Sequence, residues 1–126
     1  MSVTVSKTIK KAPRAHPYEK MAQDILGKSY EVSLVFVGEK RAQSLNQQYR
    51  HKSYVPNVLS FPLTEKAGEI YICPQVAQKE AKNFDLSPHG YIGYLFIHGL
   101  LHLKGHDHGA TMEKAEARYI SKYNLK

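Results

Sequence analysis

The sequence predicts an α+β domain in which a mixed sheet of about four strands is covered by helices. Segments that alternate between apolar and polar residues, as half-buried strands do, are interspersed with segments whose apolar residues recur at helical spacing. The longest apolar segment, residues 91–103, is hydrophobic almost all round, which indicates a buried central helix. With 126 residues, of which 42% are hydrophobic, the chain can form one core but not two. We therefore expect a single domain over residues 1–126.

The first half of the chain is predicted to fold as two strand–helix pairs. Residues 3–9 and 30–37 alternate between apolar and polar side chains, and the second segment is rich in β-branched residues, so both are predicted strands. Residues 18–26 and 39–50 have apolar side chains at helical spacing. Gly27 is expected to end the first of these helices.

The second half is predicted to contain two strands and three helices. The strands cover residues 58–63 and 68–73. Pro62 indicates that the first of them lies at an edge of the sheet, because proline has no N–H to donate to a neighbouring strand. Pro74 suits the first position of a helix. The predicted helices cover residues 74–84, 91–103 and 110–123, and loops are expected over residues 51–57 and 85–90.

The chain is basic, with 18 lysines and arginines, 11 acidic residues and a formal net charge of +7. Such a charge suggests a polyanionic partner, although ordinary solubility explains the charge alone equally well. One basic cluster contains Lys7, Lys10, Lys11 and Arg14. A second contains Arg50, His51 and Lys52, between Tyr49 and Tyr54. Cations interleaved with aromatic rings suit a nucleic-acid strand, because the cations bind its phosphates and the rings stack on its bases.

The composition is that expected of a cytoplasmic protein with no membrane partner. A single cysteine, Cys73, excludes an intrachain disulfide and suits a reducing compartment. Residues 1–5 lack the basic and apolar regions of a signal peptide. The longest apolar run is interrupted by His98 and His102 and is too short to span a bilayer.

Residues 98–108, His-Gly-Leu-Leu-His-Leu-Lys-Gly-His-Asp-His, contain four of the seven histidines. On a helix, His98 and His102 lie on one face with their Cβ atoms about 5–6 Å apart. Gly105 can end this helix in the left-handed conformation, so that the chain turns and His108 reaches back toward the pair. Three histidine nitrogens and one open position are typical of catalytic zinc. We predict Zn²⁺ bound by His98, His102 and His108.

Two other zinc sites are less compatible with these residues. A structural site is normally four-coordinate and sulfur-rich, and Cys73 is distant in sequence, although His106 is a conceivable fourth ligand. A metalloprotease of the His-Glu-x-x-His type has a glutamate base beside its first ligand. That position is Gly99 here, so a protease-like hydrolase lacks its base.

Arg50 is the candidate for binding phosphate. Cleavage of a phosphodiester requires neutralisation of the phosphate charge, which arginine achieves through two parallel hydrogen bonds. The alternative is a solvated residue at a helix end that interacts with the helix dipole. The residues alone do not decide between these two interpretations.

The histidine motif resembles that of the YbeY-type endoribonucleases, His-Gly-x-Leu-His-Leu-x-Gly-Tyr-Asp-His. Only His106, in place of tyrosine, departs from it. Leu45-Asn46, Tyr49-Arg50 and Lys52 are similar to the family's Leu-Asn-x-x-Tyr-Arg-x-Lys. Further similar segments are Val58-Leu59-Ser60-Phe61-Pro62, Gly68-Glu69-Ile70-Tyr71-Ile72, and Met112 with Glu116.

The resemblance implies a zinc-dependent endoribonuclease that cleaves single-stranded RNA in ribosomal RNA maturation and ribosome quality control. Its partners would be precursor ribosomal RNA and proteins of the small ribosomal subunit. The resemblance implies a functional arginine at Arg50. Lys52 and Ser60 are candidates for substrate contacts, although an ordinary strand role fits Ser60 better. Two departures, Pro56-Asn57 and the short segment between His108 and Met112, affect substrate contacts more than metal binding.

A non-catalytic, zinc-stabilised RNA-binding module remains as the alternative function. The sequence contains no obvious general base, which is the best argument for this alternative. Asp107 and Glu116 are candidates to orient the histidines, because histidine ligands usually donate their second N–H to a carboxylate or a carbonyl.

Overall fold

The computed structural model describes residues 2–106 and 109–126. Its strands are β1 (Val3–Lys7), β2 (Glu31–Phe36), β3 (Val58–Thr64) and β4 (Ala67–Ile72). Its helices are α1 (Tyr18–Leu26), α2 (Glu39–Arg50), α3 (Pro74–Glu80), the 3-10 helix η1 (Ala81–Phe84), α4 (Pro88–Leu103) and α5 (Ala110–Lys122). The chain thus has the predicted α+β architecture.

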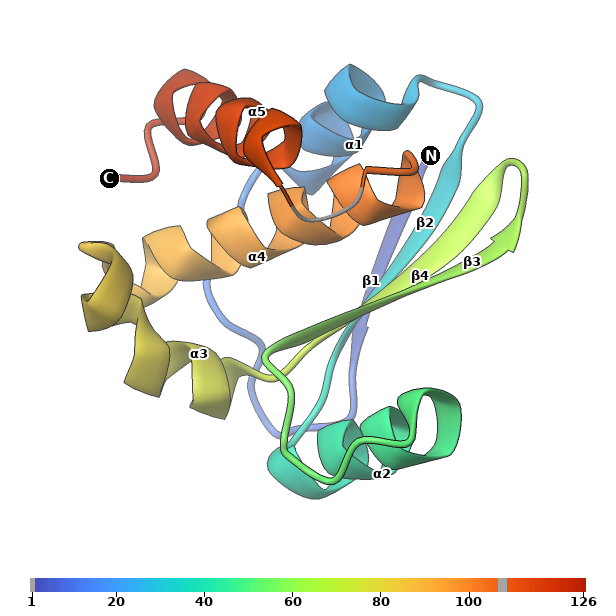
Figure 1. Ribbon diagram of the computed structural model, residues 1–126, viewed down its shortest axis with the longest axis vertical. Helices are drawn as coiled ribbons and strands as arrows, with labels where there is room; N and C mark the ends of the chain where they lie inside the picture. The colour runs from blue at the N-terminus through green and yellow to red at the C-terminus, as the bar shows by residue number, and fades with distance from the viewer. Residues whose placement is uncertain (1, 107–108) are drawn as a thin grey trace.

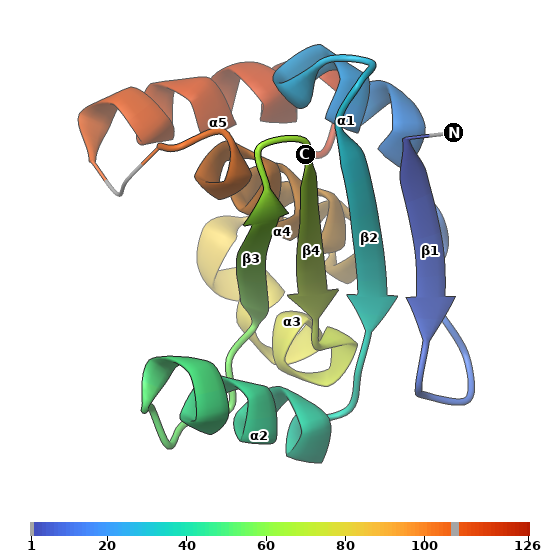
Figure 2. The same ribbon diagram turned by 90° about the vertical axis from the view of Figure 1, so that its right-hand side faces the viewer.

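The four strands form one mixed sheet in the order β1-β2-β4-β3. β1 pairs in parallel with β2, β2 pairs in parallel with β4, and β3 pairs antiparallel with β4. β3 is therefore an edge strand, as Pro62 predicted. Figure 2 shows this order, with α2 lying across the end of the sheet at which β2 ends.

α4 lies at the centre of the molecule and is buried along most of its length, as predicted. It packs on β3 and β4 on one side and contacts α1, α3 and α5 on the others (Figure 1). Phe96, Ile97 and Leu100 are completely buried within the main core. In residues 2–106 and 109–126, no helix has the length and apolar character required to cross a membrane.

The structure corrects three predicted boundaries. β1 ends at Lys7 rather than at residue 9. α4 begins at Pro88 rather than at residue 91, because the hydroxyl of Ser87 accepts a hydrogen bond from the N–H of Gly90 (3.0 Å) and proline suits the first turn. The predicted helix over residues 74–84 tightens into η1 for its last four residues. There Asp85 is left-handed, with φ 56°, and the N–H of Leu86 bonds to the carbonyl of Ala81.

α4 lies close to the sheet at Gly99. A Cβ atom at this position would lie 2.9 Å from Oγ of Ser60 and 3.0 Å from Cδ1 of Ile70. The hydroxyl of Ser60 donates a hydrogen bond to the carbonyl oxygen of Gly99 (3.1 Å). This contact fixes the turn of α4 that contains His98 and His102 against β3.

We expect Gly99→Val to lower the free energy of unfolding by about 1–3 kcal/mol, because the added atoms overpack the helix–sheet contact. Glycine is a poor helix former, so the gain in helix propensity offsets only a few tenths of a kcal/mol of this loss. Urea unfolding measures the effect. Ala117→Val, at an exposed position of α5, is the control for placing valine in a helix. Equal changes in both variants would contradict a close approach at Gly99.

Candidate active site

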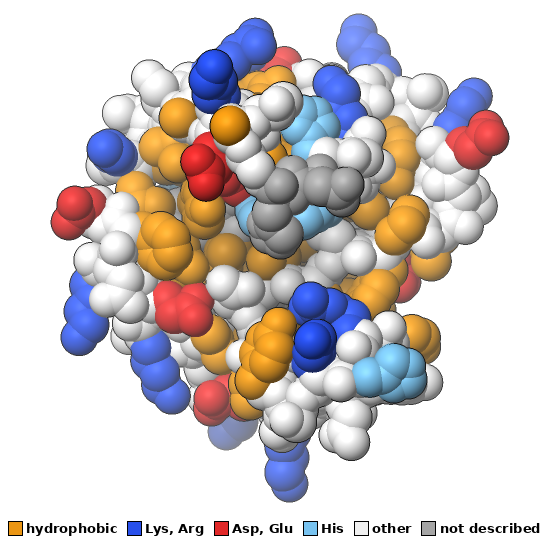
Figure 3. All heavy atoms as spheres, viewed as in Figure 1, with side chains coloured by type: hydrophobic (Ala, Val, Ile, Leu, Met, Phe, Trp, Pro, Cys, Tyr) orange, Lys and Arg blue, Asp and Glu red, His pale blue; other side chains and the backbone are white. Residues whose placement is uncertain are grey.

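A cleft of about 670 Å³ opens between α4 and α5 on one side and β3 and the end of α2 on the other. Its lining residues include Arg50, Tyr54, Asn57, Ser60, Tyr94, His98, His102, Glu113 and Glu116. Figure 3 shows a hollow on this face of the molecule, with histidine side chains at one rim and lysine or arginine side chains at the opposite rim. The cleft therefore brings imidazoles and a guanidinium to one hollow.

The end of α4 fixes the orientation of His102. Gly105, with φ 106°, follows the last turn, and its N–H bonds to the carbonyl of His102. The N–H of His106 bonds to the carbonyl of Leu101, which completes a glycine-terminated helix end. This turn directs the carbonyl oxygen of His106 to Nδ1 of His102, 3.1 Å away. Since a carbonyl oxygen can only accept, Nδ1 of His102 is the donor.

His98 is oriented by Glu116 on α5. Its Nδ1 donates to Oε2 of Glu116, whose side chain is nearly buried. The predicted contact between Glu116 and a histidine of the motif is thus present. Asp107, the other carboxylate considered for such a contact, lies outside the described residues.

The arrangement of the two imidazoles fits a metal site. With each Nδ1 donating, the neutral ring has its lone pair on Nε2, which is the form that binds a metal. The two Nε2 atoms lie 3.1 Å apart. Two nitrogens bound tetrahedrally to one zinc ion, each at 2.0–2.1 Å, would be separated by about 3.3 Å. His98 and His102 are thus close to the geometry of two ligands of a single ion.

The full predicted set of ligands extends beyond the described residues. His108 lies outside them, and its role as the third ligand stays a prediction. Within residues 2–106 and 109–126, no three histidine, cysteine, aspartate or glutamate side chains are grouped so that they could hold a metal ion.

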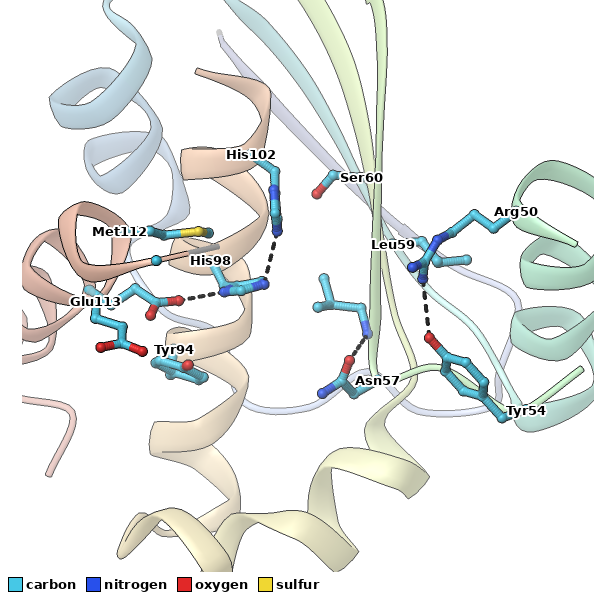
Figure 4. Close-up of a pocket in the computed structure, with 13 residues that line it drawn as sticks. Arg50, Tyr54, Asn57, Leu59, Ser60, Tyr94, His98, His102, Met112 and Glu113 are labelled. Carbon is cyan, nitrogen blue, oxygen red and sulfur yellow. Dashed lines mark hydrogen bonds and ion pairs between the residues drawn. The ribbon is translucent and has the colours of Figure 1, made fainter. Parts of the chain in front are cut away.

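Arg50 lies across the cleft from His98 and His102 (Figure 4). Its Nη1 donates to Oδ1 of Asn46 and to the hydroxyl oxygen of Tyr54, each at 3.3 Å. Asn46 is completely buried, and its Nδ2 donates to the backbone carbonyl of Tyr54 (3.0 Å). The guanidinium is therefore held at the last turn of α2 by a fixed side chain, while Arg50 itself remains exposed.

The two predicted substrate contacts differ in position. Ser60 lines the cleft, but its hydroxyl proton is used in the hydrogen bond to Gly99. Lys52 is exposed and does not belong to the residues that line the cleft. Its backbone N–H bonds to the carbonyl of Asn46 (3.3 Å), so it lies beside Arg50 at the end of α2. A substrate role for either residue stays a prediction.

Sequence reasoning missed Tyr94 and Glu113 as cleft residues. Tyr94 precedes His98 by four residues, so the spacing that pairs His98 with His102 also places Tyr94 on the same face of α4. Burial, followed by the nearby carboxylate of Glu116, raises the pKa of Tyr94 to about 12. The phenol therefore stays protonated at neutral pH and presents a hydroxyl group to the cleft.

The fold and the cleft define a small α+β protein. Its cleft contains two histidines, each oriented by a hydrogen bond from its Nδ1, and an arginine on the opposite wall. A sequence model of the family described as endoribonuclease YbeY matches residues 2–124. The chain belongs to this family.

Relatives described as endoribonuclease YbeY come from diverse bacteria. The chain is 36% identical to one from Bdellovibrio bacteriovorus, over 75% of this chain and 62% of the relative. It is 34% identical to one from Mesoplasma florum, over 79% and 70%, and 38% identical to one from Neisseria meningitidis, over 71% and 62%. In two of these three matches, the chain covers less than two thirds of the relative's length.

The solution structure of a protein from Thermotoga maritima has a similar fold. It is 26% identical in sequence, with a TM-score of 0.67, and the match covers 96% of this chain and 88% of that one. The likeness therefore extends over nearly the whole α+β architecture.

Proposed function

We propose that this protein is a zinc-dependent endoribonuclease that cleaves single-stranded RNA. The observation that supports this most is the pair of Nε2 atoms of His98 and His102, 3.1 Å apart in a cleft whose opposite wall contains Arg50. Membership of the endoribonuclease YbeY family supports the same reaction. In this proposal His98, His102 and His108 hold the zinc ion.

The residues of the chain divide the chemistry among them. Zinc, when bound, acts as a Lewis acid that polarises a phosphoryl oxygen and makes water more acidic. Arg50 binds the non-bridging phosphate oxygens and neutralises the charge that grows in the transition state. Glu116 and the carbonyl of His106 hold the imidazoles in the tautomer that presents Nε2 to the cleft.

The expected substrate is ribosomal RNA in an unpaired region. Tyr54 lies beside Arg50 and Tyr94 lies beside His98, so both rings can stack on unpaired bases. The bases of a duplex are already stacked and paired and do not offer their faces. The family resemblance is the basis for a role in the maturation of precursor ribosomal RNA and in ribosome quality control, in the cytoplasm. Proteins of the small ribosomal subunit are the proposed partners.

We expect the purified protein to cut an end-labelled single-stranded RNA and to leave the same sequence intact in a perfect duplex. A zinc chelator should stop cleavage, and added Zn²⁺ should restore it. Gel analysis of the products, with zinc content measured on the same preparation, tests both points. RNA binding without cleavage by the zinc-loaded protein would instead identify a non-catalytic RNA-binding module. Cleavage that is unaffected by removal of the metal would contradict the proposal.

A further inference from the structure

A row of aromatic rings leads from the cleft to the surface of the molecule. The ring centroids of His98 and Tyr94 lie 6.1 Å apart, and those of Tyr94 and Phe84 lie 5.8 Å apart. Tyr91 lies behind this row and stacks on both neighbours, at 5.6 Å from Tyr94 and 5.0 Å from Phe84. The row thus connects the metal-site histidine of α4 with η1.

Tyr91 makes the row rigid. It is 1% exposed, and its hydroxyl donates to Oε1 of Glu80 (3.0 Å). The same oxygen accepts from Nδ2 of Asn57 (3.0 Å), a residue of the cleft lining. Burial raises the pKa of Tyr91, so this donor stays protonated. Phe84 and Tyr94 therefore stack on a buried ring whose hydroxyl group is held by Glu80.

The outer end of the row is open to solvent. Phe84 is 50% exposed although it is one of the largest apolar side chains of the protein. Tyr94 is partly exposed and lines the cleft. Neither ring needs this exposure for the contacts it makes with Tyr91, so each has surface left for a further stacking partner.

We propose that Phe84 and Tyr94 form a stacking platform for bases of single-stranded RNA on one side of the bond to be cut. This inference rests on the proposed function. Bases in a helical strand repeat every ~3.4 Å. The step of 5.8 Å between Phe84 and Tyr94 therefore suits an extended strand, with one base at each of these two rings. Base–aromatic stacking tolerates any sequence, because every base has a π-face.

Charge favours RNA over an apolar peptide as the occupant. Lys82 precedes Phe84 by two residues in η1 and is exposed, so a cation accompanies the outermost ring. Arg50 lies at the other end of the path, across the cleft from His98. Single-strand-binding surfaces combine cations for the phosphates with rings for the bases in this way.

The test compares Phe84→Leu, which keeps apolar bulk but removes the ring, with Phe84→Tyr, which keeps the ring. The zinc-loaded proteins are assayed on one single-stranded RNA and on a series in which a single abasic nucleotide replaces successive positions near the cut. On the intact RNA, we expect Phe84→Leu to lower kcat/KM roughly fivefold to a hundredfold, the effect of losing one stacked base. Phe84→Tyr should remain within about threefold of the parent protein, since it keeps the stacking face.

The abasic series separates stacking from a structural effect. At one position beside the cut, the abasic nucleotide should lower kcat/KM of the parent protein by the same factor as Phe84→Leu does on the intact RNA. On that abasic substrate, Phe84→Leu should cause no further decrease in kcat/KM. An equal loss in Phe84→Leu on every substrate, or no loss on the intact RNA, would overturn the platform while the cleavage function stands. If Phe84→Leu does not fold, the abasic penalty of the parent protein and its retention in Phe84→Tyr decide the question. No cleavage of any RNA by the parent protein would overturn the proposed function itself.

Discussion

Replacing His98 with alanine is expected to abolish high-affinity zinc binding and, with it, RNA cleavage. The substitution removes one Nε2 of the pair that lies 3.1 Å apart, and it leaves Glu116 nearly buried without its imidazole donor. Because metal catalysis contributes several kcal/mol of transition-state stabilisation, cleavage should fall by about a thousandfold or more. Zinc content after dialysis, and cleavage rates measured at added Zn²⁺, report the two effects separately.

Glu116→Gln tests how much the hydrogen bond between Nδ1 of His98 and Glu116 contributes to zinc affinity. The amide oxygen can still accept from Nδ1 of His98, but it lacks the charge that makes the imidazole a stronger ligand. We expect zinc affinity to fall about 10- to 100-fold, measured by competition with a chelator of known affinity.

His51→Asn is the control for the loss of a histidine in His98→Ala. His51 is exposed and left-handed with φ 58°, a conformation that asparagine tolerates. Unchanged zinc content in His98→Ala would exclude His98 as a ligand.

The pairing of His98 and His102 on one face could be predicted because their relation is local. A spacing of four residues on a helix determines that His98 and His102 share a face, and glycine at position 105 determines where the helix ends. The contacts that orient these rings differ in their range. The carbonyl of His106 follows from the helix-ending turn, whereas Glu116 reaches His98 from another helix, so only the packing of α5 on α4 brings them together.

The order of the strands is one part of the fold that the sequence did not predict. Alternating residues identify strands and Pro62 identifies an edge, but neither specifies that β4 pairs between β2 and β3. That order rests on the parallel pairing of β4 with β2, two strands that are separated in the chain by α2 and β3. The sequence patterns also did not predict where a helix begins when a capping residue decides it. Ser87 caps α4, and the helix therefore begins three residues earlier than predicted.

The second large effect is expected at Arg50. Arg50→Ala should reduce RNA cleavage about 10²- to 10³-fold, because the guanidinium is the positively charged donor that faces His98 and His102 across the cleft. The residue is exposed and its side chain bonds only to Asn46 and Tyr54 in the part of the chain that the structure describes, so folding and zinc content should be unchanged. Rates at saturating and limiting RNA, together with thermal melts, measure these quantities.

Arg50→Lys should restore only part of the activity, because an ammonium group keeps the charge but cannot form two parallel hydrogen bonds to a phosphate. Arg41→Ala is the matched control: it removes an exposed arginine from the same helix, and Arg41 does not belong to the cleft lining. If Arg50 binds phosphate, its removal should also decrease the slope of log affinity against log salt by about 0.7, the value for one contact to a single strand. Loss of cleavage with an unchanged salt slope would assign Arg50 to the transition state alone. Full cleavage in Arg50→Ala would place phosphate recognition elsewhere in the cleft.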